Sequence, residues 1–182
     1  MKSFLLGLIL TTIAAVFSSP TWAQSNHEEP AWQSLEGNWA GHLSYRDFRS
    51  NEWVQIPHRR VIQIAPDASW VTMRSSYSDP GREVYGFELI QQRGTMLSIA
   101  STGRQGIEVR ELQLASSDSG AEGQQWRLTG ESKDNGRPAR IEYRWQIQGN
   151  ALTVETWVEY LDAGDSEQAP FIRNRIDLER QS

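Results

Sequence analysis

The sequence contains no cysteine, and its only histidines are His27, His42 and His58. The absence of cysteine excludes thiol catalysis, thiolate metal sites and disulfide crosslinks. A zinc site needs three or four converging ligands, so three scattered histidines do not indicate one. The chain also lacks a phosphate-binding glycine loop and a nucleophile-elbow pattern. We therefore expect neither a metal nor another cofactor, and we assign no catalytic residue.

The sequence also lacks a strong excess of either positive or negative charge. The chain has 18 Lys and Arg residues against 23 Asp and Glu residues, which gives a formal net charge of −5. A nucleic-acid-binding domain usually carries a basic patch or stripe, so this balance argues against a nucleic-acid partner. The two signs are interspersed along the chain, as on an ordinary solvated surface.

Only one long apolar run is present, from Phe4 to Phe17. It is shorter than the about 20 residues of a membrane-spanning helix, so we expect a protein that does not span the membrane. Lys2 precedes the run, and small Thr21 and Ala23 follow it as in a signal-peptidase site. We predict a signal peptide at residues 1–23, cleaved after Ala23, and a periplasmic or secreted protein.

The predicted mature chain of about 160 residues is long enough for one domain with its own core. Residues 24–34 are mostly polar and are interpreted as an N-terminal arm. Residues 35–182 are interpreted as a single domain. A helical turn is expected only at residues 29–35.

The segment 35–45 alternates most clearly between apolar and polar residues. One face carries Leu35, Gly37, Trp39, Gly41, Leu43 and Tyr45. A period of two predicts a β-strand with one buried face. Glycines on both sides of Trp39 allow another backbone or a large side chain to approach closely there.

Further strand-like segments follow, separated by short turns. With the first, we expect strands near residues 38–47, 53–64, 69–77, 83–92, 96–101, 107–115, 125–131, 140–148, 152–160 and 171–178. Consecutive hairpins favour an up-and-down meander, and closure removes its exposed edges. The predicted fold is an all-β, antiparallel up-and-down β-barrel of about 8–10 strands, with a flattened sandwich as the alternative. Pro57 marks a bulge or an edge, because proline cannot donate to a ladder.

The Gly37-x-Trp39 opening, the meander and the arginines of the last strand resemble the lipocalin-like (calycin) superfamily. The opening also resembles a small exported bacterial family of unassigned function. In lipocalin-like barrels the first-strand tryptophan packs against an arginine of the final strand at the closed end. The resemblance implies that Arg173 or Arg175 covers Trp39, and that the interior holds a small ligand.

A barrel of this size can enclose one small ligand, and a guanidinium beside a tyrosine hydroxyl would bind a carboxylate. The candidate ligand-binding residues are Arg74, Tyr77, Tyr143, Arg144, Tyr160, Arg173 and Arg175. The alternative is that the arginines of the last strand lie outside and pair with Glu155 and Glu159. Such exposed pairs contribute about 0–1 kcal/mol and imply no function.

The expected function is non-catalytic binding of a small apolar or amphipathic ligand inside the barrel. A second hypothesis is an envelope protein-interaction or structural module that uses the barrel exterior, with Trp53 or Trp157 as its anchor. A third, an enzyme, requires Glu88, Glu142 and Arg144 to gather in one cleft.

Overall fold

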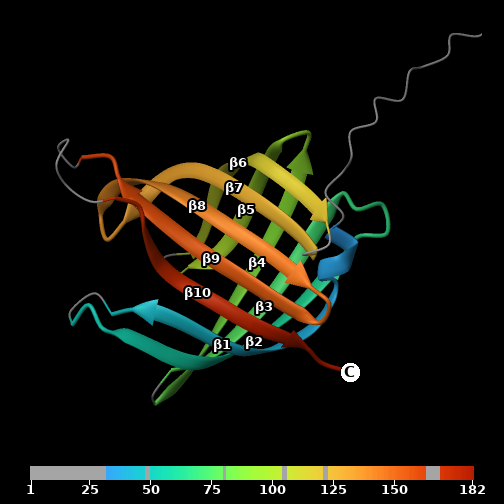
Figure 1. Ribbon diagram of the computed structural model, residues 1–182, viewed down its shortest axis with the longest axis horizontal. Helices are drawn as coiled ribbons and strands as arrows, with labels where there is room; N and C mark the ends of the chain where they lie inside the picture. The colour runs from blue at the N-terminus through green and yellow to red at the C-terminus, as the bar shows by residue number, and fades with distance from the viewer. Residues whose placement is uncertain (1–31, 48–49, 80, 104–105, 121–122, 163–168) are drawn as a thin grey trace, which may run out of the picture.

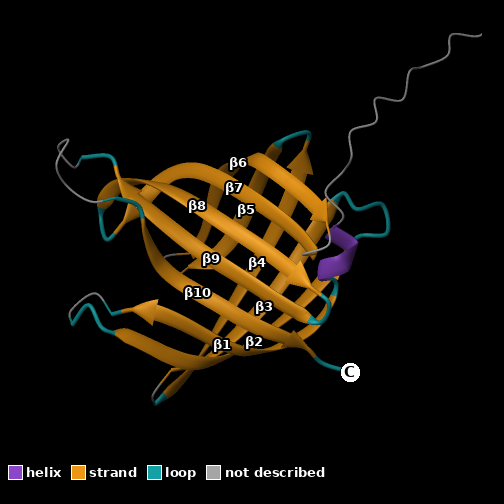
Figure 2. Cartoon of the chain, viewed as in Figure 1, coloured by secondary structure: helices purple, strands orange, loops and turns teal. Residues whose placement is uncertain are grey.

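The computed structural model describes residues 32–47, 50–79, 81–103, 106–120, 123–162 and 169–182. The predicted signal peptide and all of the predicted arm before Trp32 lie outside these residues. The described chain consists of one short 3₁₀-helix and ten strands (Figures 1 and 2). The elements are η1 (Trp32–Leu35), β1 (Gly37–Arg46), β2 (Trp53–Ile64), β3 (Trp70–Asp79), β4 (Arg82–Arg93), β5 (Met96–Gly103), β6 (Gly106–Gly120), β7 (Gly123–Asp134), β8 (Arg137–Gln148), β9 (Ala151–Tyr160) and β10 (Phe171–Arg180).

Each strand pairs antiparallel with the next, and β1 pairs with β10 to close the barrel (Figure 1). The predicted all-β, up-and-down barrel is therefore confirmed, and the sandwich alternative is wrong. The largest difference from the expected segments is β6. Its polar residues 116–120 have loop-like composition, yet they continue the strand and pair with β7.

Turn chemistry explains why the strands fold back so tightly. Asn135 and Gly136 join β7 to β8 with φ values of 49° and 80°. Positive φ at both central residues is the geometry of a two-residue hairpin turn, whose twist matches that of the strands. Gly149, with φ of 58°, lies in the equally short turn between β8 and β9.

Pro57 lies where β2 has a neighbour on one side only. Residues 53–64 of β2 face β1 over most of their length, with Pro57 opposite His42, whereas pairing with β3 begins at His58. The missing N–H of proline is tolerated because this part of β2 is an edge. The sequence-based expectation of an edge or bulge is thus met by an edge.

One end of the barrel is closed by η1. Trp32 stacks on Trp126 with ring centroids 5.4 Å apart, and Trp39 donates from Nε1 to the Leu35 carbonyl at 2.9 Å. Leu35 is fully buried. Trp32, which lies in the segment interpreted as the arm, therefore packs against the barrel.

The arginine over Trp39 is Arg180, so the expectation of Arg173 or Arg175 is corrected. The Arg180 guanidinium lies 4.2 Å from the Trp39 ring centroid and donates to the backbone carbonyls of Ser34 and Glu36. The register explains the choice, because Trp39 is directly opposite Arg180 across β1 and β10. Gly37, with φ of 141°, leaves room for that guanidinium, which a Cβ at this position would meet at 2.6 Å.

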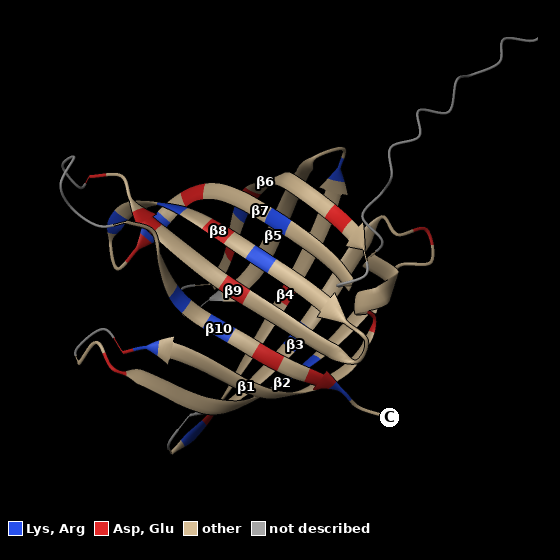
Figure 3. Ribbon diagram, viewed as in Figure 1, with Lys and Arg blue, Asp and Glu red and all other residues tan. Residues whose placement is uncertain are grey.

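Alternate residues of every strand point into the barrel interior. Its main buried cluster includes Trp39, Ile62, Met73, Leu97, Leu128 and Leu152. Lys and Arg positions and Asp and Glu positions are interspersed along the strands of the barrel (Figure 3). The alternation of side chains along each strand therefore determines which charged side chains lie inside the barrel. Those inward charged residues belong to the site described below.

Candidate functional site

A cavity of about 320 Å³ lies in the barrel interior. Its apolar lining includes Leu43, Ile90, Ile99, Leu128, Val154 and Ile176. Its polar lining includes Arg60, Ser75, Tyr77, Glu88, Arg110, Tyr143, Thr156 and Asn174. Ligand pockets in proteins have volumes of about 300–1,000 Å³ and combine apolar walls with a few polar groups. The cavity is therefore at the small end of this range and has the mixed lining of a binding site.

An ion pair crosses the cavity wall between β4 and β6. Arg110 donates to Glu88 with 2.8 Å between its Nη2 and the Glu88 Oε1. The same guanidinium lies 5.6 Å from the ring centroid of Tyr143 on β8. Burial raises the pKa of the Tyr143 hydroxyl, and the positive charge of Arg110 partly opposes that rise. Tyr143 is thus a neutral hydroxyl facing a paired charge.

A second guanidinium, that of Arg60 on β2, is more deeply buried, with 5% of the residue exposed. Its Nε donates to the Ser75 hydroxyl at 3.2 Å, and its Cζ lies 6.0 Å from the ring centroid of Trp145. Among the residues that the structure describes, no carboxylate pairs with it.

His58 is two residues before Arg60 on the same inward face and is 1% exposed. Its ring stacks on Tyr77 with centroids 4.6 Å apart. Burial, reinforced by the charge of Arg60, lowers the pKa of His58 to about 3; a backbone contact with Ser76 acts weakly in the opposite direction. Neither ring nitrogen has a hydrogen-bond partner at ordinary geometry within the described chain. The imidazole is therefore neutral at physiological pH.

Tyr77 and Tyr143 are the two predicted ligand-binding residues that line the cavity. Arg60, Glu88 and Arg110 supply its charges, and none of them was among the predicted binding residues. The sequence pattern around Arg60 did indicate that its side chain lies inside the barrel. Ile56, His58, Arg60 and Ile62 alternate along β2 and share its apolar face, which places both polar residues inside.

Tyr160 and Arg173 meet away from this cavity. Asp134 accepts a hydrogen bond from the Tyr160 hydroxyl at 2.7 Å and lies 3.4 Å from the Arg173 Nε. Arg173 also donates to the Arg46 carbonyl at 2.8 Å. Burial and the Asp134 hydrogen bond raise the pKa of Tyr160. A second hollow of about 230 Å³ connects this group with Arg110 and Tyr143.

A β-bulge explains why Arg173 turns inward while Arg175 does not. The β9–β10 register shifts between Ile172 and Asn174, so that Arg173 is the extra residue. A bulge redirects a side chain locally. The Arg173 side chain is 13% exposed, whereas that of Arg175 is 47% exposed.

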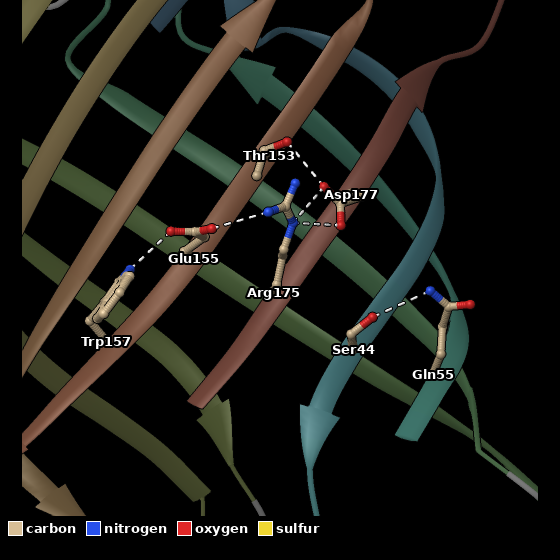
Figure 4. Close-up of polar contacts among 7 residues, drawn as sticks. All are labelled: Ser44, Gln55, Thr153, Glu155, Trp157, Arg175 and Asp177. Atoms are coloured by element: carbon tan, nitrogen blue, oxygen red, sulfur yellow. Dashed lines mark hydrogen bonds and ion pairs between the residues drawn. The ribbon is translucent and has the colours of Figure 1, made fainter. Parts of the chain in front are cut away.

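Arg175 belongs to a polar group on the outer face. It contacts Glu155 at 3.2 Å and Asp177 at 2.9 Å, and Glu155 also accepts from Trp157 Nε1 at 2.9 Å (Figure 4). Arg144 lies 4.2 Å from the Trp157 ring centroid, so Trp157 is covered rather than offered to a partner. Arg74 is exposed on β3. The structure thus places Arg74, Arg144 and Arg175 outside the barrel.

The carboxylates that the enzyme hypothesis requires do not lie together in one cleft. Glu88 faces the cavity, whereas Glu142 pairs with Arg144 and Arg127 on the outer face. Within the described ranges, no group of three or more His, Cys, Asp or Glu residues could hold a metal ion. None of the helices in the described part of the chain is long and apolar enough to cross a membrane.

The exterior carries an exposed apolar patch, which we name the outer strip. Its members are Tyr85, Phe87 and Leu89 on β4, Ala100 on β5, and Ile107 and Val109 on β6. Leu89, Ala100 and Val109 are consecutive cross-strand neighbours. Tyr85 is 77% exposed and Ile107 is 76% exposed. The expected anchors Trp53 and Trp157 lie outside this strip.

No family model matches the chain, and no curated protein matches it. A solved structure, the crystal structure of Rv2717c from M. tuberculosis, superposes with a TM-score of 0.59 at 13% sequence identity. The match covers 85% of this chain and 99% of that chain. At this identity the likeness is one of fold, and it supports the barrel architecture alone.

Proposed function

We propose that this protein binds a small apolar or amphipathic molecule inside its barrel and does not transform it. The observation that carries the proposal is the cavity of about 320 Å³ with its mixed lining. A core evolved for stability alone is packed without such space, because an empty cavity loses contacts among its walls. The lipocalin-like assignment and export to the periplasm or beyond are part of the same proposal, supported by the Gly37-x-Trp39 opening and the apolar N-terminal run.

Organic extraction of the natively purified protein, followed by mass spectrometry, tests the proposal. We expect one small molecule at a stoichiometric amount. A second test uses N-phenyl-1-naphthylamine, a neutral apolar probe whose fluorescence rises in apolar surroundings. We expect saturable binding to the wild-type protein.

A matched pair of variants locates the binding. Ser101 lines the cavity, whereas Ser98 is on the opposite face of β5. Ser101→Phe fills the cavity and is expected to abolish probe binding, and Ser98→Phe is expected to leave it unchanged. Equal binding by all three proteins would overturn the proposal.

A second candidate function, protein interaction through the exterior, is favoured by the outer strip. Contiguous exposed apolar residues of this kind often mark interaction surfaces. It predicts that Ile107→Lys disrupts a complex formed by the native protein while probe binding inside the barrel is retained. Native mass spectrometry of wild type and variant makes this comparison.

A further inference from the structure

The charges around the central cavity do not balance. Arg110 is paired with Glu88, and the neutral His58 adds no charge. Arg60 is left with a hydroxyl and an aromatic face as its contacts within the described chain. The polar lining therefore carries one uncompensated positive charge.

Arg60 cannot relieve this imbalance by itself. A guanidinium stays protonated at all ordinary pH values, so burial does not neutralise it. A buried charge without a partner is strongly unfavourable. Since Nε is already used by Ser75, the terminal NH₂ groups are the donors left for another molecule. Their fork geometry suits a carboxylate.

We propose that the ligand is an amphipathic monocarboxylate, with its carboxylate held by Arg60 and its apolar tail packed among the aliphatic residues of the cavity. The inference rests on the proposed function of interior binding. One negative charge matches the one uncompensated positive charge, whereas a phosphate monoester would bring nearly two. The apolar walls nearby, which include Leu43, Val154 and Ile176, suit a hydrocarbon tail.

Isothermal titration calorimetry with decanoate and 1-decanol tests the inference, because the two probes share a tail and differ in the head group. A hydrogen bond to a charged partner corresponds to about 10- to 100-fold in affinity, so wild type is expected to prefer decanoate by that factor. Arg60→Met is expected to lose the preference and to keep its affinity for 1-decanol. Arg74→Met, a change on the exposed face of β3, is the matched control and is expected to behave as wild type.

The outcomes separate the two proposals. Equal affinity of wild type for both probes, or an unchanged preference in Arg60→Met, would overturn the carboxylate inference and leave interior binding standing. Failure of wild type to bind either probe would overturn interior binding, and the inference with it.

A measurement on the wild-type protein keeps the inference testable if Arg60→Met does not fold. The carboxyl signal of ¹³C-labelled decanoate reports the ionisation of the bound acid. Contact with a guanidinium favours the charged form, so the pKa of bound decanoate is expected below that of free decanoate. A bound pKa above the free value would contradict contact with Arg60.

Discussion

The closed end of the barrel and its central cavity are built from similar residues but treat their polar groups differently. At the closed end, Trp39 donates to Leu35 and the guanidinium of Arg180 donates to two backbone carbonyls. At the cavity, the lining residue Arg60 has one hydrogen bond, and His58, two residues earlier on the same strand face, has none at ordinary geometry within the described chain. Since unpartnered buried polar groups are destabilising, the first region contributes to stability and the second lowers it, as a site for the proposed interior ligand would.

Truncating the closed end is expected to have the largest effect. Trp39→Ala removes a fully buried side chain together with the Arg180 contact and the hydrogen bond to Leu35. Replacing a buried tryptophan by alanine costs about 3–5 kcal/mol of unfolding free energy. Urea unfolding followed by circular dichroism measures this loss. A loss of unfolding free energy under about 1 kcal/mol would show that the closed end is not the stabilising region.

The buried imidazole of His58 is expected to make stability depend on pH. Its pKa is about 3 in the folded chain and about 6.5 when unfolded. Below about pH 6.5 the unfolded chain binds a proton that the folded chain does not, so stability falls as the pH falls toward 3. The loss between about pH 6 and pH 4 is about 2–3 kcal/mol.

Urea titrations at several pH values compare wild type with His58→Phe and with His42→Phe, a control on the outer face of β1. We expect the pH dependence in this window to flatten only in His58→Phe. An identical slope in all three proteins would mean that His58 takes up its proton equally in the folded and unfolded chains, which would contradict its lowered pKa.

Replacing Arg60 is expected to stabilise the protein, in contrast to every change at the closed end. Arg60→Met removes an uncompensated buried charge and keeps an unbranched side chain in its place. Exchanging buried charges for apolar groups of similar volume often stabilises by about 1–4 kcal/mol. The Trp145 contact at 6.0 Å is at the limit of a cation–π interaction and offsets only part of the penalty.

Thermal unfolding without added ligand measures this gain, with the exposed Arg74→Met as the reference change. If Arg60→Met is less stable than wild type, the contrast between the closed end and the cavity fails. That result would mean that the charge of the guanidinium is already compensated in the empty barrel.

The sequence predicted the barrel well, because strand alternation and turn residues are local signals. It placed the arginines of the last strand poorly for two physical reasons. The inward bend of Arg173 depends on a bulge between β9 and β10, which arises from pairing between distant segments. The choice of Arg180 over Trp39 depends on the β1–β10 register, which local patterns do not define. Arg60 differs from these, since the alternation of β2 alone placed it inside.

The smallest effect is expected from Arg175→Gln on the outer face. Asp177 accepts a hydrogen bond from Arg175 and thereby raises the pKa of that guanidinium, and Glu155 adds a second ion pair (Figure 4). Water screens these contacts because nearly half of the Arg175 side chain is exposed, so the loss should stay within about 1 kcal/mol. Urea unfolding at low and high salt measures it, and decanoate affinity should not change. A reduced affinity for decanoate would show that the outer arginines contribute to binding, and the proposed division between a binding interior and solvated outer arginines would then fail.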